Sequence, residues 1–301
     1  MVSVFFVVLI LFSIYTVRIF RSADSKGGLS FSAGLSKDRI AVVEVKGVII
    51  KSKAIVELIH KAEKDEDSKA IILRVNSPGG AVAPTQEIYD EIRRIDNLYT
   101  TSKGKKGKPI YASFASVAAS GGYYLGAATR RICALPGTIT GSIGVIMQFM
   151  DMSKLYDWAM LKPKTIKSGR YKDVGQPTRS MTKEEQELME LMTKGVHKQF
   201  IKDIVATREK VIKGDLNEHA QGQIFSGEQA HKIGLVDELS GLWGCARNIH
   251  KELKLKDELN LKYIKKKKKM KILDILGDLN KVTSFISEMM TNSDSPRLMY
   301  K

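Results

Sequence analysis

The stretch SKAIILRVNSPGG, residues 68–80, decides the fold class of this 301-residue chain. Its centre, residues 70–75, is an almost unbroken apolar run that favours a strand buried on both faces of a sheet. The Pro-Gly-Gly at its end is typical of a tight turn. A strand buried on both faces needs helices on either side of its sheet, so the stretch predicts an α/β fold.

Strand and helix patterns alternate on either side of this stretch. Residues 40–45 and 110–117 are two further strand-like runs, and residues 54–64 and 85–95 repeat apolar side chains at helical spacing. Three more elements are predicted: a helix that begins at Ser120, a strand at 131–135, and a long helix at 182–208 with Thr182 and Glu185 as a capping box.

The composition permits a large buried core. With 43% hydrophobic residues, the chain can form one large α/β core or two small ones. The net charge of +16 is concentrated at residues 102–109, 161–172 and 265–269. These charged segments lack a repeated interleaving of aromatic side chains for base stacking, and we therefore predict no nucleic-acid partner.

An apolar run opens the chain. Residues 2–20, VSVFFVVLILFSIYTVRIF, carry no charge before Arg18. The run is close to the roughly 20 residues that span a bilayer, and no clear small-residue cleavage site follows it. We predict a retained transmembrane anchor at 1–21, which makes membrane lipid a partner, and a Gly/Ser-rich linker at 22–38. Arg18 and Arg21 favour a cytoplasmic location for the rest of the chain.

The two cysteines, Cys133 and Cys245, lie far apart in the sequence and lack CxxC spacing. The spacing indicates neither a zinc site nor a disulfide framework. We expect both residues to behave as small buried hydrophobes.

Two glycine-rich turns end consecutive predicted strands: NSPGG at 76–80 and AASGG at 118–122. In a parallel sheet such turns meet at one crevice, where their backbone N–H groups could bind an oxyanion. Ser120 would then expose its hydroxyl at the start of a helix, as a nucleophile requires. The alternative is that Ser120 only caps this helix.

A serine nucleophile needs a base, and the five histidines lie in polar, helical patterns that favour surface or packing roles. A neutral lysine can also activate serine. Lys172 is a candidate because Lys164, Lys167 and Arg170 lie close to it in sequence, and like charges disfavour protonation. The alternative is a solvated basic loop.

Several motifs carry a resemblance to a known family. They are RVNSPGG (74–80), AASGGYYLGAA (118–128), PGTITGSIGVI (136–146), TIKSGRYKD (165–173) and GQIFSGEQAHKIGLVDELSG (222–241). In this order, from about residue 39 to 241, the chain resembles the signal peptide peptidase A family, which are membrane-bound serine proteases. The resemblance implies a ClpP/crotonase-like fold of repeated β-β-α units, with a Ser/Lys protease domain at 39–257.

The resemblance also implies roles for single residues. Ser120 corresponds to the nucleophile, Lys172 to the base and Ser142 to a serine that orients the lysine amine. Gly79 or Gly80, together with the amide of Gly121, corresponds to the oxyanion hole. No metal or cofactor is required by this mechanism.

For function, the resemblance implies a serine endopeptidase that acts on extended peptides such as signal-peptide remnants. It further implies a homo-oligomer, such as an octamer, in which Ser120 and Lys172 of one site come from neighbouring subunits. The protease domain would lie outside the cytoplasmic membrane on a single-pass anchor, against the orientation that Arg18 and Arg21 favour.

Three alternative functions are open. One is a protease that processes a specific membrane partner, such as a stomatin-like protein. Another is a non-catalytic membrane scaffold. The third is a crotonase-type enzyme acting on acyl-CoA thioesters, which would call for glutamates at the pocket and no anchor.

The C-terminal segment, 258–301, combines a run of five lysines at 265–269 with apolar positions at helical spacing. These positions are Ile272, Ile275, Leu276, Leu279, Val282, Ile286 and Met289. They predict a basic amphipathic helix. It could lie on an anionic membrane, plug a neighbouring protease groove, or pack on the flank of the domain.

Overall fold

The computed structural model describes residues 38–265. The predicted anchor at 1–21 and the apolar positions of the predicted tail helix lie outside the described residues. Within the described part, no helix combines the length and the apolar character needed to cross a bilayer.

The centre of the fold is a sheet with three long parallel strands, β1 (Arg39–Lys46), β2 (Ser68–Ser77) and β3 (Ile110–Ala119). Three shorter strands, β5 (Ile139–Gly141), β6 (Ile224–Ser226) and β8 (Leu261–Tyr263), complete the sheet in the order β6-β5-β3-β2-β1-β8. A fourth short strand, β4 (Ile132–Ala134), pairs with β3 outside this order. The fifth, β7 (Glu238–Leu239), pairs with β4. Only β5 and β6 pair antiparallel among the described strands.

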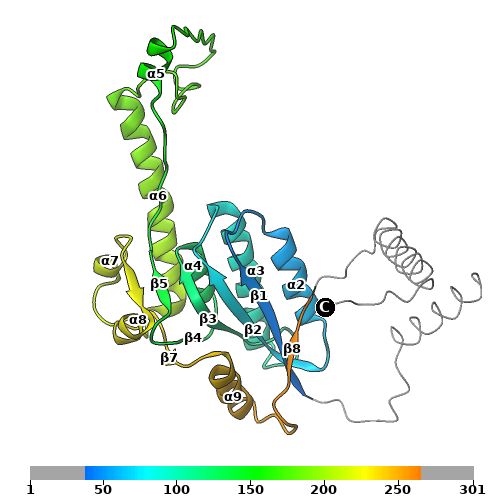
Figure 1. Ribbon diagram of the computed structural model, residues 1–301. Coiled ribbons are helices and arrows are strands. Elements are labelled where there is room, and N and C mark those ends of the chain that lie inside the picture. The colour runs from blue at the N-terminus through cyan, green and yellow to red at the C-terminus, as the bar shows by residue number, and fades with distance from the viewer. Residues whose placement is uncertain (1–37, 266–301) are drawn as a thin grey trace, which may run out of the picture.

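Both faces of the sheet are covered, as the apolar strands predict. The helices α2 (Lys53–Glu63), α3 (Val82–Thr101) and α4 (Gly121–Ala127) lie on one face, over a core that includes Val43 and Leu73. On the other face α9 (Leu242–Glu252) covers Ile40, Ile72 and Tyr111 (Figure 1). The α/β class is therefore confirmed.

The β-β-α unit is only partly visible in the element order. In the first half of the domain, strands and helices alternate singly as β1-α2-β2-α3-β3-α4. The second strand of the expected unit is reduced there to a bridge between Ile49 and Gly80. Two strands follow one another without a helix at β4 and β5. Strand β8, inside the segment assigned to the tail, pairs with β1 and so extends the sheet beyond residue 257.

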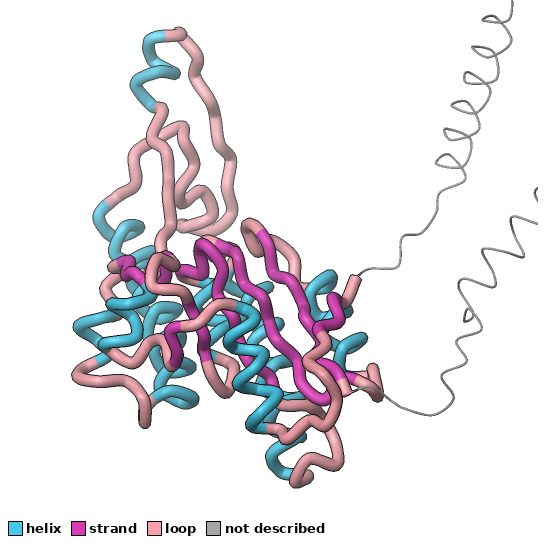
Figure 2. The backbone as a smooth tube through the Cα atoms, turned by 60° about the horizontal axis from the view of Figure 1, so that its bottom comes forward, coloured by secondary structure: helices cyan, strands magenta, loops and turns pink. Residues whose placement is uncertain are grey.

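An arm, residues 147–192, projects from the body of the domain. It contains α5 (Ser153–Trp158) and the first turns of α6 (Lys183–Arg208), whose other end packs on the core through Phe200 and Ile204. Figure 1 shows α5 at the far end of this arm, and the turned view of Figure 2 shows the same projection. The predicted capping box of Thr182 and Glu185 opens α6. Two short helices, α7 (Leu216–His219) and α8 (Gly227–Lys232), lie beside β6 in the chain.

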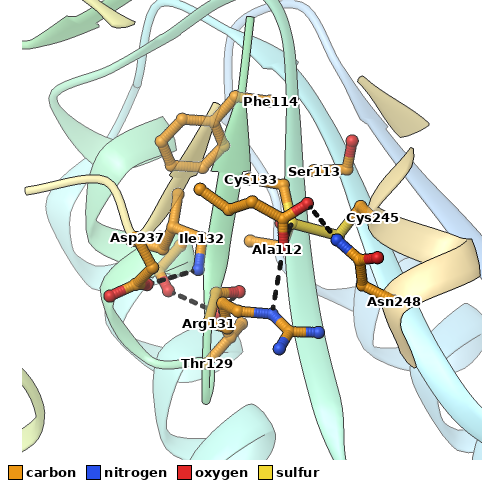
Figure 3. The surroundings of a disulfide bond; sticks show 12 residues. Ala112, Ser113, Phe114, Thr129, Arg131, Ile132, Cys133, Asp237, Cys245 and Asn248 are labelled. Atoms are coloured by element: carbon orange, nitrogen blue, oxygen red, sulfur yellow. Dashed lines mark hydrogen bonds and ion pairs between the residues drawn. A yellow bond between two sulfur atoms is a disulfide. The ribbon is translucent and has the colours of Figure 1, made fainter. Parts of the chain in front are cut away.

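The prediction for the two cysteines is wrong in one respect. Cys133 and Cys245 are fully buried, as expected, but they form a disulfide with a Cα–Cα distance of 6.0 Å. The bond joins β4 to α9 across the face of the sheet that α9 covers (Figure 3). Sequence spacing could not reveal it, because 112 positions separate the two residues and only the packing of α9 brings them together.

Candidate active site

The two glycine turns meet because their strands are parallel neighbours, with Ser77 of β2 paired with Ala118 of β3. Gly79 lies so close to the second turn that a Cβ atom on it would be 2.8 Å from the Gly121 nitrogen. Its φ of +106° is also one that side chains disfavour. The glycine at 79 therefore allows the two backbones to touch.

Ser120 sits on a strained turn between β3 and α4. Its φ and ψ are +53° and −121°, a sparsely populated combination for a residue with a side chain. Its N–H donates to the carbonyl of Gly141 at 2.8 Å. The residue occupies the N-cap position, but its side chain makes no capping hydrogen bond. The capping alternative is therefore not realised, and the turn resembles the strained elbow that presents a serine nucleophile.

Two backbone N–H groups beside Ser120 are available for a ligand. In the part of the chain that the structure describes, neither the N–H of Gly80 nor that of Gly121 donates to a protein acceptor. They are close together, since a Cβ on Gly121 would lie 3.3 Å from the Gly80 nitrogen. The N–H of Gly79, in contrast, donates to Ser77 Oγ at 3.1 Å. Of the two glycines offered by the sequence, Gly80 has the free donor.

A mostly apolar cavity of about 130 Å³ opens beside this turn. Gly80, Ser120 and Gly121 contribute to its lining. The remaining lining residues are Val82, Thr85, Gln86, Tyr124, Gly144, Val145, Ile146, Val196 and Phe200. The cavity is therefore bounded by α3, α4, α6 and the segment that follows Ser142.

Hydrogen bonds and ring contacts fix the aromatic side chains that line the cavity. The Tyr124 hydroxyl donates to the Asp203 carboxylate of α6, and the Tyr124 ring meets the Phe200 ring edge-on with 4.8 Å between the ring centroids. Tyr89 donates to the Asp203 carbonyl at 2.9 Å. Burial, and then the Asp203 carboxylate, raise the pKa of Tyr124 far above its usual value, so its hydroxyl stays protonated.

Ser142 lies at the end of β5, directly after the Gly141 that accepts from the Ser120 N–H. It also has a positive φ, +52°, and its own N–H donates to the Gln223 carbonyl at 2.6 Å. The structure thus brings Ser120, Ser142, Gly79, Gly80 and Gly121 into one region.

Lys172 is not part of this region within one chain. It is exposed on the arm, beside Tyr171 and Arg170, which both contact Glu184 in the first turn of α6. Phe200, which lines the cavity, lies sixteen residues further along α6, a rise of about 24 Å. The crowding expected from Lys167 and Arg170 is offset, because each forms an ion pair with a carboxylate.

Sequence reasoning missed the apolar lining of the cavity and the ion pairs of the arm. The signal for the lining was present in part, since Val196 and Phe200 are four residues apart on a predicted helix. Nothing in the sequence shows that this stripe faces Ser120. None of the five histidines, all of which the structure describes, lines the cavity.

Known proteases resemble this chain over much of its length. The sequence matches peptidase family S49 over residues 102–256 and the Clp protease family over residues 24–134. A Synechocystis protein named as a candidate protease is 35% identical over 206 residues, which is 68% of this chain and 70% of that protein. An Enterococcus faecium protein named as a candidate signal peptide peptidase, SppA, is 30% identical over 259 residues, 82% of this chain and 73% of its own length.

A solved structure, that of a serine-to-alanine mutant of the 1510-N membrane-bound stomatin-specific protease, covers 77% of this chain and 100% of its own. Its TM-score is 0.48 and its sequence identity 15%. The Clp protease match fits the ClpP-like fold expected from the motifs. The family match spans half the chain and the relatives align over most of their length, so the chain belongs to peptidase family S49, the SppA family of serine proteases.

Proposed function

We propose that this chain is a membrane-anchored endopeptidase in which Ser120 attacks the peptide carbonyl. One observation carries the proposal: a strained serine turn lies beside two unpaired N–H groups, those of Gly80 and Gly121, at the edge of an apolar cavity. A carbonyl oxygen that becomes negatively charged next to Ser120 would accept hydrogen bonds from both groups.

The proposed base is Lys172 of a neighbouring copy of the chain. Within one chain the arm holds Lys172 too far from Ser120 for a side chain to bridge. The arm also exposes many large apolar side chains, among them Trp158 at 81%, Met160 at 88% and Ile166 at 90%. Such a surface favours contact with another copy, and a ring such as an octamer would repeat the contact for every site.

The proposed reaction proceeds in two halves. Neutral Lys172 Nζ accepts the proton of Ser120 Oγ while Oγ bonds to the carbonyl carbon. The ammonium then gives the proton to the leaving amine, the peptide C–N bond breaks, and an acyl-enzyme remains. Water, deprotonated by the same amine, releases the second product. Ser142, placed beside Ser120, would orient the lysine amine.

The proposed substrates are extended peptides with a small or medium apolar side chain at the cleaved bond. Val82, Val145 and Ile146 contribute apolar surface to the cavity next to Ser120. Signal-peptide remnants have this chemistry. Extended backbone suits a groove between strand ends, because such backbone can add to neighbouring strands.

We also propose that the domain lies outside the cytoplasmic membrane, with residues 1–21 as its anchor. The buried Cys133–Cys245 disulfide supports this side of the membrane, because structural disulfides persist in oxidising compartments and are rare in the cytosol.

The test is casein hydrolysis by the full-length protein in detergent. Ser120→Ala and Lys172→Ala should each lower the rate at least about a thousandfold. Ser116→Ala and Lys164→Ala, at exposed positions nearby, serve as matched controls. Co-expression of the two inactive variants should restore about a quarter of the wild-type rate, because random mixing supplies both intact residues to one site in four.

Full activity of both single variants would disprove the dyad. Inactive singles whose mixture also stays inactive would disprove the sharing of one site between two subunits.

A further inference from the structure

Charged side chains surround the loop that carries Lys172 and form ion pairs with one another. Lys172 takes part in none of these ion pairs. The cations are Lys167, Arg170 and Arg179, and the anions are Asp173 on the loop with Glu184 and Glu185 on α6. Every one of these carboxylates is bonded to one of these cations. Lys172 itself makes no ion pair with any residue between 38 and 265.

Asp173, the next residue in the chain, is the carboxylate closest to Lys172 in sequence. It is also the carboxylate of this group that contacts two cations. Its side chain is 9% exposed. The Arg179 guanidinium donates to both of its oxygens, at 2.8 and 3.0 Å, and Lys167 Nζ contacts the first. Arg179, and then Lys167, hold the pKa of Asp173 well below its usual range. The carboxylate is therefore ionised at every pH at which the enzyme would be assayed.

Arg179 is itself fixed from the other side. Glu185 accepts from both Arg179 Nη atoms, at 2.6 and 2.8 Å, and from the Thr182 N–H at 2.9 Å. Arg179, and then the Thr182 amide, lower the pKa of Glu185 to about 2. Thr182 and Glu185 form the capping box of α6. Because Arg179 bonds to both Asp173 and Glu185, it links the Lys172 loop to the first turn of this helix.

We propose that Arg179 is a positioning residue that occupies the Asp173 carboxylate and so keeps it from pairing with the Lys172 amine. The inference rests on the proposed function, in which Lys172 must be neutral to accept the Ser120 proton. A carboxylate that paired with Lys172 would stabilise the protonated amine and remove the base. Lys167 assists by contacting Oδ1 of the same carboxylate. Arg170 forms an ion pair with Glu184, so this second carboxylate of the arm is also kept from pairing with Lys172.

The test is the pH dependence of kcat/KM for the full-length protein. Arg179→Gln removes the donor to Asp173 Oδ2 and leaves only Lys167 on Oδ1, so Oδ2 can pair with Lys172. The acid limb of the profile should then move to higher pH by about one unit, with about tenfold less activity along that limb. Asp173→Asn combined with Arg179→Gln removes the released carboxylate and should return the limb to its wild-type position. Lys194→Gln, which breaks an exposed ion pair elsewhere on α6, is the control and should not move the limb.

Lys167→Gln provides a second variant, should Arg179→Gln fail to fold, because Lys167 contacts Asp173 but, unlike Arg179, makes no bond to the capping residue Glu185. It should move the acid limb in the same direction by a smaller amount. If the variants of Arg179 and Lys167 lower kcat/KM equally at every pH, their role is structural and the inference is wrong. Full activity of Lys172→Ala is a different failure: it would overturn the proposed dyad, and the inference with it.

Discussion

At the scale of single residues, the backbone of Ser120 is unusual for its residue type. A φ of +53° with a ψ of −121° is costly for any residue that has a Cβ atom. The turn is nevertheless maintained by the hydrogen bond from Ser120 to Gly141 and by the close contact of Gly79 with Gly121. Strain of this kind is typical of functional sites, where the surrounding fold supplies the compensation.

This strain predicts opposite effects on activity and stability. Ser120→Gly should abolish cleavage and raise the free energy of unfolding by about 1 kcal/mol relative to Ser120→Ala, because relief of strain exceeds the extra entropy of glycine in the unfolded chain. Urea unfolding of both variants provides the measurement. Equal stability of the two variants would show that the relieved strain is no larger than the entropy cost of glycine, and would contradict this prediction.

At the scale of elements, α6 combines two functions in one helix. Its C-terminal half packs on the core through Phe200 and Ile204 and ends at Arg208, which is 2% exposed and bonded to Asp237. Its N-terminal half carries the loop of Lys172 away from the body (Figure 1). A single helix therefore lines the cavity at one end and, at its other end, holds the loop of the base that in our proposal serves another subunit.

Helix α9 is linked covalently to the sheet by the Cys133–Cys245 disulfide. The disulfide closes a loop of 112 residues, so Cys133→Ala with Cys245→Ala should lower the free energy of unfolding by roughly 4–5 kcal/mol in the chain-entropy estimate. Urea unfolding with and without dithiothreitol provides the measurement. Reductant should destabilise the wild type by a similar amount and leave the double variant unchanged. A wild type that unfolds identically in both conditions would contradict the link.

At the scale of the whole molecule, the arm exposes an apolar surface that no other segment between residues 38 and 265 covers. Residues at its far end, such as Trp158 and Met160, make little contact with the body, whereas the cavity that faces Ser120 lies at the other end of α6. Large exposed apolar side chains that gather on one segment are typical of interaction sites.

The proposed assembly can be tested at this surface. Trp158→Asp with Met160→Asp should dissociate the oligomer and remove activity, since the site would lose its base. It should change the free energy of unfolding of the subunit by no more than about 0.5 kcal/mol, because both side chains are exposed. Sedimentation velocity and thermal unfolding give the two readouts. Trp243→Asp, on α9 and 54% exposed, is the matched control. An unchanged sedimentation coefficient would rule out this part of the arm as the interface.

Much of the fold could be predicted from local pattern. The strands at 40–45, 70–75 and 110–117 and the helix at 182–208 all lie within or at the edges of observed elements, because apolar periodicity reports which face of an element is buried. The capping box of Thr182 is equally local, since its two hydrogen bonds span three residues. The glycine turns were also predicted to meet, because adjacent parallel strands end at the same edge.

Local sequence alone therefore specifies the α/β class, the order of the main elements and the serine turn. Four further facts come only from the packed chain: which glycine amide is free, that Cys133 and Cys245 are bonded, that Arg179 occupies Asp173, and that Lys172 lies far from Ser120. The physical reason is range. Periodicity and capping act over a few residues, whereas the disulfide and the distance from Lys172 to Ser120 depend on where distant segments lie in the packed fold. The bonds of Gly79 to Ser77 and of Arg179 to Asp173 join residues two and six positions apart, but they depend on loop conformations that periodicity does not specify.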